Sequence, residues 1–150
     1  MTKNEIREFS LRIAEGSKTD LVVTTYDIIL HYIAEAEAAV AEDNKDDVVF
    51  NLQKAKQFVN HLSSCLDFKF SISAELMRLY IYINNCLVKD IIKRNTNHAD
   101  SIRNVIKGLR EAFSQISSQD TSGKAIKNSE QVYVGYTYGK TSTLNEVIVR

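Results

Sequence analysis

Apolar side chains recur at helical spacing along this chain from its N-terminus to about residue 117. Ile6 and Phe9 share one face of a short first helix, which the pattern ends near Gly16. Ser17 then offers an N-cap for a second helix, and Asp20, three positions later, can return a hydrogen bond as a capping-box glutamate does. The second helix is predicted to run to about residue 42.

Three more helices follow in the same pattern. A polar turn at 41–47 precedes the third helix, and the irregular stretch "DFKFSIS" at 67–73 precedes the fourth. The turn "NTNHAD" at 95–100 precedes the fifth helix and offers Asn97 as its cap. Four helices of about five turns, joined by short loops, favour an antiparallel up-down four-helix bundle.

We therefore predict an all-α fold, with this bundle core and a short additional N-terminal helix forming a helical domain at 1–117. From residue 118 onward the composition becomes polar, and then rich in tyrosine, valine, threonine and glycine. Such a composition is typical of flexible or extended chain rather than helix, so an irregular C-terminal tail is predicted at 118–150.

The second and fourth helices carry more apolar surface than one buried face requires. An ordinary surface helix has an apolar arc of about 100°, whereas the arc on the second helix covers about two-thirds of the circumference. The fourth helix has an inner stripe of Leu76, Tyr80, Ile83, Leu87 and Ile91, with Met77, Ile81, Val88 and Ile92 on one flank and Leu79 on the other. Two interpretations stay open. Either neighbouring helices cover both flanks, or one flank is an open groove for a partner.

Charge and cysteine content narrow the class of protein. Lysine plus arginine equals aspartate plus glutamate at 19 each, so no bulk charge draws the chain to nucleic acid or an anionic membrane. No run of about 18 apolar residues predicts membrane insertion, and the N-terminus lacks the unbroken apolar core of a signal peptide. Cys65 and Cys86 are isolated, as reduced thiols in the cytoplasm are. These features predict a cytoplasmic protein.

Catalytic and metal chemistry find no support in the sequence. A di-metal site in a helical bundle needs Glu-x-x-His pairs, and the chain has none. His61 shares a helix face with Cys65 at four-residue spacing, but two ligands do not make a metal site. The chain also lacks a glycine-rich phosphate loop and a nucleophile elbow. We predict no enzymatic activity, no cofactor and no metal.

Several stretches resemble the FliS family, the flagellin-specific export chaperones. "TTYDIILHYIAEAEAAV" at 24–40 is similar to the family signature "LYDGAIRFL…A". "LQKAKQFVNHLSSCLDFKFSISAELMRLYIYINNCLV" at 52–88 keeps the spacing of the next family motif, with Leu66-Asp67, Ile72 and Leu79-Tyr80 at matching positions. "IKGLREAF" at 106–113 resembles the closing "LL.ELR..W". The resemblance covers about residues 5–117.

The chain departs from the family pattern at a few positions. The family's "SP" before the second helix is Ser17-Lys18 here, which keeps the cap and loses the proline. Ile28 replaces the small residue of "LYDG", and Ile81 replaces the aspartate of "LYDYI". The change at residue 81 makes that flank of the fourth helix more apolar, so these departures bear on how a partner binds.

The resemblance implies an export chaperone that binds the C-terminal region of flagellin. Such a chaperone prevents premature polymerisation in the cytoplasm and assists delivery to the flagellar export apparatus. Components of the flagellar export gate are implied as further partners. The residues themselves also allow a non-flagellar helical adaptor that self-associates through an apolar flank, and they leave the choice between monomer and dimer open.

The candidate flagellin-binding residues are apolar flank positions on three helices. They are Leu21, Ile28 and Tyr32 on the second helix, Phe50 and Phe58 on the third, and Ile81, Val88 and Ile92 on the fourth. For each of these positions, packing in the core is the competing interpretation. Ile6 and Phe9 form a candidate segment that covers the empty groove. Phe68 and Phe70 either line the groove or plug the end of the bundle, and plugging is expected.

Overall fold

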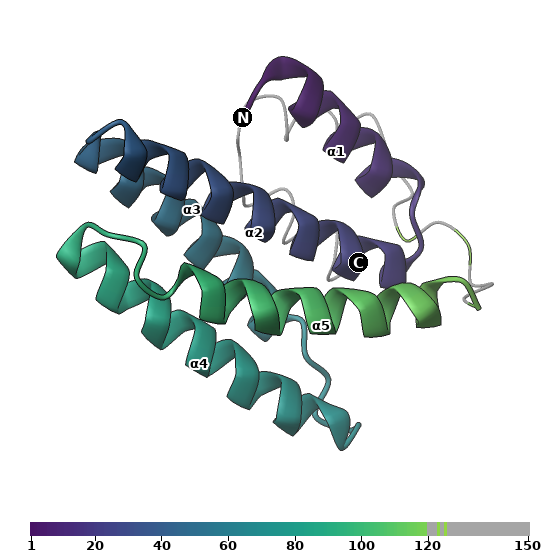
Figure 1. Ribbon diagram of the computed structural model, residues 1–150. Helices are drawn as coiled ribbons and strands as arrows, with labels where there is room; N and C mark the ends of the chain where they lie inside the picture. The colour runs from purple at the N-terminus through teal and green to yellow at the C-terminus, as the bar shows by residue number, and fades with distance from the viewer. Residues whose placement is uncertain (120–122, 124, 126–150) are drawn as a thin grey trace. The chain divides into compact units, whose positions relative to one another are not determined.

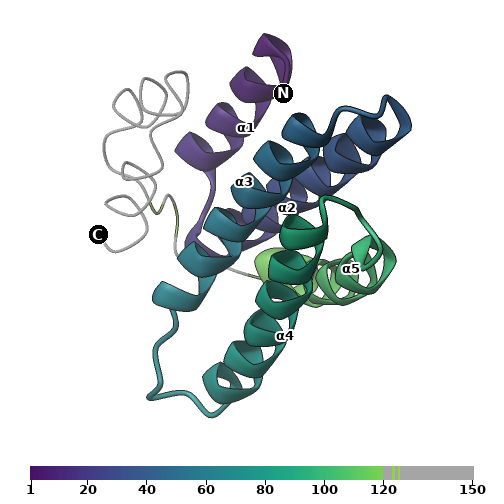
Figure 2. The same cartoon turned by 90° about the vertical axis from the view of Figure 1, so that its left-hand side faces the viewer.

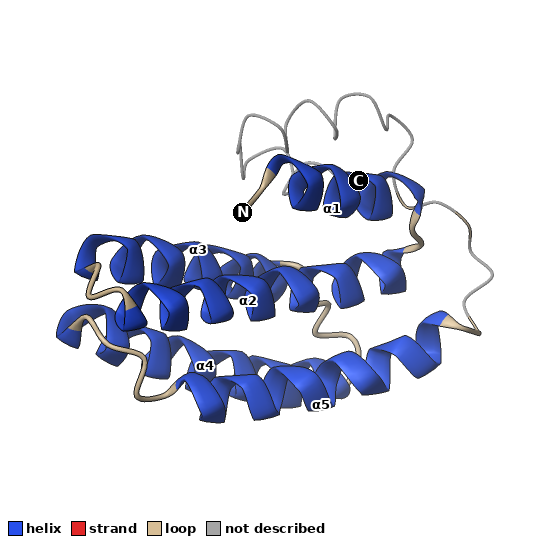
Figure 3. Cartoon of the chain, turned by 45° about the horizontal axis from the view of Figure 1, so that its top comes forward, coloured by secondary structure: helices blue, strands red, loops and turns tan. Residues whose placement is uncertain are grey.

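The computed structural model describes residues 1–119, Gly123 and Ala125, and this part of the chain is helical with no strand (Figures 1 and 3). Its helices are α1 (Lys3–Glu15), α2 (Lys18–Ala41), α3 (Lys45–Ser64), α4 (Ile72–Lys93) and α5 (Ala99–Ser117). The predicted all-α fold is confirmed over these residues. The predicted tail at 118–150 lies almost wholly outside them.

The chain divides into two compact units. The central unit is Asp27–Gly108, and the terminal unit is Met1–Tyr26 together with Leu109–Arg150. The division cuts α2 and α5, so each of these helices contributes one part to each unit. The boundary predicted after residue 117 does not follow this division and stays a prediction.

Side-chain contacts join each helix of the central unit to the next in a closed ring. They are Tyr32 with Phe58 for α2 and α3, Asn60 with Asn84 for α3 and α4, Asp90 with His98 for α4 and the start of α5, and Glu37 with Arg103 for α2 and α5. A second contact between α3 and α4 joins Asp46 to Arg94 at 3.8 Å. Because the later residue of α3 meets the earlier residue of α4, the two helices run antiparallel, and Figure 2 shows them side by side. The predicted up-down four-helix bundle is confirmed.

The apolar stripes found in the sequence form the core of the central unit. Each helix contributes side chains that are no more than 7 % exposed. They are Ile28, Ile29, Ile33 and Ala36 of α2, Val48, Leu52, Ala55 and Val59 of α3, Leu76, Tyr80, Ile83 and Leu87 of α4, and Ile102 and Ile106 of α5. Burial of this apolar area, at about 25 cal/mol per Å², is the main favourable term for the bundle.

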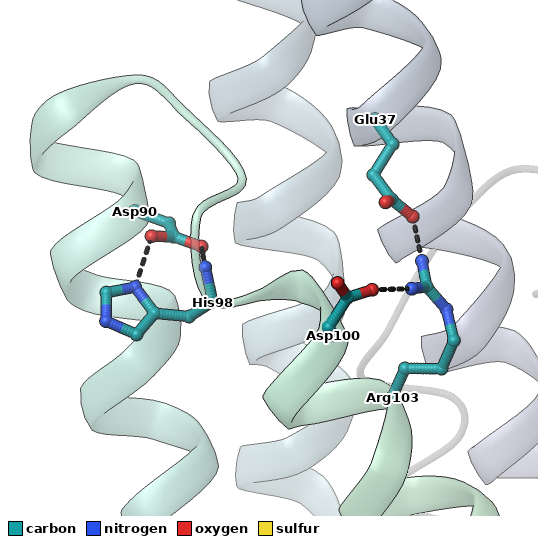
Figure 4. A network of polar contacts seen from close by, with 5 residues as sticks. All are labelled: Glu37, Asp90, His98, Asp100 and Arg103. Atoms are coloured by element: carbon teal, nitrogen blue, oxygen red, sulfur yellow. Dashed lines mark hydrogen bonds and ion pairs between the residues drawn. The ribbon is translucent and has the colours of Figure 1, made fainter.

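A carboxylate of α4 holds the start of α5. Asp90 is 1 % exposed, and its Oδ2 accepts a hydrogen bond from the backbone N–H of His98 at 3.0 Å. Its Oδ1 lies 2.6 Å from Nδ1 of the same histidine (Figure 4). The prediction of an Asn97 cap is wrong, because α5 begins at Ala99 and the residue before it is His98.

Two capping boxes begin the helices of the terminal unit. At α1, Thr2 accepts from the N–H of Glu5, and Glu5 accepts from the N–H of Thr2. At α2, the N–H of Ser17 donates to Asp20 at 2.9 Å, and Ser17 Oγ accepts from the N–H of Asp20 at 3.2 Å. The reciprocal bond predicted for Asp20 is therefore confirmed.

Gly16 forms the corner between α1 and α2, where the chain leaves no room for a side chain. A Cβ atom at this position would lie 2.8 Å from the carbonyl oxygen of Arg12 and 2.8 Å from Cβ of Asp20. Real Cβ atoms do not approach backbone this closely, so a larger residue forces the corner apart.

Gly16→Ala is expected to lower the free energy of unfolding by about 1–3 kcal/mol, because the new methyl group overlaps fixed backbone. Gly108→Ala is the matched control, since a Cβ there meets nothing within 4 Å and the residue lies inside α5. This second change is expected to stabilise by up to about 1 kcal/mol. Urea unfolding followed by circular dichroism measures both, and equal effects of the two changes contradict the assignment of Gly16 to a crowded corner.

Candidate functional site

One side of α4 exposes a row of apolar side chains to solvent. Ile81, Val88 and Ile92 are 51 %, 38 % and 75 % exposed. On a helix of about 100° per residue they lie within about 40° of one another, well away from the buried stripe of α4. From Ile81 to Ile92 the row extends about 16 Å along the helix. We call these three residues the α4 flank.

The α4 flank borders the line along which α3 and α4 meet. Asn84 of α4 donates from Nδ2 to Oδ1 of Asn60 at 2.6 Å. Asp46 and Arg94 form the second contact, near the C-terminal end of α4. We call this line, marked by the two contacts, the α3–α4 seam (Figure 2). A helical ligand lying on the α4 flank would therefore rest beside α3 as well.

The second helix, by contrast, is a central helix whose flanks are covered. Leu21 and Ile28 are 2 % and 0 % exposed, and Phe58 of α3 is 6 % exposed. The structure therefore favours the core-packing interpretation for these three positions, and their role in binding flagellin stays a prediction. Helical periodicity gave these positions the same pattern as α4 but carries no information on how many neighbours a helix has.

Tyr32 is half-buried, and its ring stacks on that of Phe58 at 6.0 Å with an interplanar angle of 22°. Burial raises the pKa of the Tyr32 hydroxyl above 10.0, and the nearby carboxylate of Glu35 raises it further. The phenol is therefore neutral at physiological pH.

Phe50 is exposed, as predicted, but it does not belong to the α4 flank. It is 54 % exposed, and Lys54 lies over its ring at 5.6 Å. On the wheel of α3, Phe50 lies about 80° from Asn60. It is a separate apolar spot.

The loop before α4 presents its two aromatic rings outward. Phe68 and Phe70 are 62 % and 64 % exposed, so the expectation that they plug the end of the bundle is wrong. Asp67 organises the loop. Its carbonyl oxygen accepts from the N–H of Phe70 at 3.2 Å and from Oγ of Ser73 at 2.6 Å, so the turn holds the rings away from the core.

Ile6 and Phe9 of α1 are half-buried, and the guanidinium of Arg12 lies 5.7 Å from the ring centroid of Phe9. Both residues belong to the terminal unit, whereas the α4 flank belongs to the central unit. The proposed role of α1 as a cover for a guest-binding surface stays a prediction.

The described residues contain no group of three or more His, Cys, Asp or Glu side chains placed to hold a metal ion. His61 is 7 % exposed, and its Nε2 lies 3.8 Å from Sγ of Cys65. Burial raises the pKa of the Cys65 thiol, partly offset by a hydrogen bond from Ser64. A thiol with a raised pKa is a poor nucleophile at neutral pH.

The described helices include none with the length and hydropathy needed to cross a membrane. Leaving apolar side chains exposed to water is unfavourable. An exposed apolar row of this kind is typical of a surface that receives a partner.

The sequence interpretation missed Asn60 and Asn84. Asn84 lies three residues after Ile81 and four before Val88, so it shares their side of α4. A polar residue at that spacing inside an apolar row is visible in the sequence. Its pairing with Asn60, 24 residues away, is a tertiary contact that spacing does not reveal.

Comparison with known proteins identifies a family and a relative that this chain resembles. The family model described as "Flagellar protein FliS" matches residues 4–120. The flagellar secretion chaperone FliS of Bacillus subtilis (strain 168) is 26 % identical over 96 residues, which cover 64 % of this chain and 72 % of the relative. The region that the family model matches includes the whole of α2, α3, α4 and α5, and so the α4 flank.

Proposed function

We propose that this chain, which belongs to the FliS family of flagellar proteins, is a flagellar export chaperone that binds the C-terminal region of flagellin through the α4 flank. The observation that carries the proposal is the exposure of Ile81, Val88 and Ile92 as one row on a folded bundle. In a protein without a partner, exposing such an apolar row to water is unfavourable in free energy. In a chaperone it is the binding surface.

The physical mechanism is folding of the guest on contact. A segment that is disordered in the flagellin monomer and helical in the filament lays its apolar face along the α4 flank, as an amphipathic helix does on an apolar surface. Burial contributes about 25 cal/mol per Å², and ordering the guest opposes it by about 2–5 kcal/mol. The net affinity is therefore high enough to hold the guest and low enough to release it.

Polymerisation is prevented because the same apolar face cannot contact another flagellin while it covers the chaperone. We place this step in the cytoplasm, before the subunit is delivered to the export apparatus. The proposal assigns no catalytic chemistry to the chain and no role to a cofactor. Export-gate components are further candidate partners for the loaded chaperone.

The test is calorimetric titration of the full-length protein with a synthetic peptide of the flagellin C-terminal region, with circular dichroism of the same mixtures. We expect a Kd of about 1 μM or below and a gain in helicity beyond the sum of the free components. A peptide of the same composition in scrambled order is the control, and it should give neither signal.

Absence of heat and of added helicity with the native peptide would reject the flagellin assignment. The competing function is a non-flagellar adaptor that self-associates through the same residues. Sedimentation velocity separates the two, because an adaptor of that kind forms a dimer that Val88→Asp disrupts and that the flagellin peptide leaves unchanged.

A further inference from the structure

Two asparagines interrupt the apolar surface beside the α4 flank. Asn84 lies about 40° from Val88 on the helical wheel, and its side-chain amide is bonded to that of Asn60 across the α3–α4 seam. Asn60 is exposed and Asn84 is half-buried. A helix that covers the α4 flank and leans on α3 therefore covers this amide pair too, and removes it from water.

The hydrogen bonding of the pair is incomplete. Within the part of the chain that the structure describes, Oδ1 of Asn84 is buried and has no hydrogen-bond partner. Exchanging the assigned oxygen and nitrogen of the Asn84 amide would still leave one of its two ends without a hydrogen bond, because Asn60 contacts only one end. A guest on the surface cannot reach this buried oxygen, so the part of the pair that a guest can contact is the exposed side chain of Asn60.

We propose that the Asn60–Asn84 pair sets the register of the guest helix on the α4 flank. This inference rests on the proposed function, since the guest is the flagellin segment. The guest places one glutamine or asparagine side chain against the pair, and its apolar residues against Ile81, Val88 and Ile92. A side-chain amide carries both donors and an acceptor, so it can accept a hydrogen bond from Nδ2 of the exposed Asn60 and donate one to Oδ1 of the same residue.

Apolar contact alone does not select one register. Because the α4 flank repeats at helical spacing, a guest helix displaced by one or two turns still meets apolar side chains. A displaced guest, however, puts an apolar residue over the asparagine pair and buries its amides unmatched, which is unfavourable. A buried asparagine in a coiled coil selects the partner's register in the same physical way.

The experiment is a set of double-mutant cycles measured by calorimetry. Each glutamine and asparagine of the flagellin C-terminal peptide is changed to alanine in turn, and each peptide is titrated into the wild-type protein, Asn84→Ala and Asn60→Ala. We expect one peptide position whose replacement weakens binding about 5- to 30-fold with the wild-type protein, and less than about 2-fold with either asparagine variant. Asn97→Ala, at an exposed turn position, is the control and should behave as wild type.

The outcomes separate this inference from the proposed function. If the wild-type protein binds the native peptide but no peptide position couples to either asparagine, the register role is wrong and the proposed function stands. If the wild-type protein does not bind the peptide, both are wrong. Asn60 is exposed, so Asn60→Ala keeps the test valid even if Asn84→Ala does not fold.

Discussion

Replacing Val88 and Ile92 together with aspartate is expected to weaken binding of the flagellin peptide by at least about 100-fold. Each side chain loses its apolar contact with the guest, worth roughly 1.5–3 kcal/mol when fully buried. The guest must in addition desolvate two carboxylates that it cannot pair. Calorimetry with the native peptide measures the loss directly.

The same change should leave the bundle folded. Val88 and Ile92 are already 38 % and 75 % exposed, so carboxylates there remain hydrated in the free protein. Substitutions at such surface positions shift stability by less than about 1 kcal/mol. Thermal unfolding of the variant should therefore stay cooperative. A variant that fails to fold would place these side chains in the core, against their exposure in the structure.

A matched control lies on the same helix. Ile72 and Leu79 are 60 % and 36 % exposed, close to the values of the two test positions, but they lie on the opposite flank of α4. Ile72→Asp with Leu79→Asp adds the same charge to the same element, and we expect it to change the Kd less than about 3-fold. An equal loss of affinity in both double variants would show that the guest does not select the α4 flank.

The helices were predictable because their signals are local. Apolar spacing and the Ser17–Asp20 pair involve residues within a few positions of one another, and the structure has the predicted capping box. A wheel also separates Ile81, Val88 and Ile92 from the buried stripe. The pattern left open whether neighbouring helices cover that flank, and the structure shows it exposed.

The parts that sequence reasoning missed depend on tertiary contacts. Three residues have the same apolar character as the α4 flank but are buried by neighbouring side chains in the folded chain, namely Leu21, Ile28 and Phe58. A helical wheel does not show how many other helices pack against a given face. The α5 cap was assigned to Asn97 because caps are usually local. The structure uses Asp90 instead, a residue of the preceding helix eight positions away from the histidine it binds.

Asp90→Ala is accordingly expected to lower the free energy of unfolding by about 2–4 kcal/mol, a large share of the 5–15 kcal/mol typical of a domain. The change removes a carboxylate that is 1 % exposed and leaves the backbone N–H of His98 without its acceptor. Asp90→Asn should cost less, because the amide oxygen can still accept one of the two hydrogen bonds.

Asp100→Ala is the control for this change, since Asp100 is a neighbouring carboxylate whose side chain is 91 % exposed (Figure 4). It bonds Arg103 at 2.6 Å, but an exposed pair contributes less than about 1 kcal/mol. Urea unfolding of the three variants measures the order of the effects. If Asp100→Ala costs as much as Asp90→Ala, the burial of Asp90 does not govern the stability of the α4–α5 connection. If Asp90→Ala alone is severe, α5 is held in the bundle by the hydrogen bonds that the buried side chain of Asp90 makes to His98.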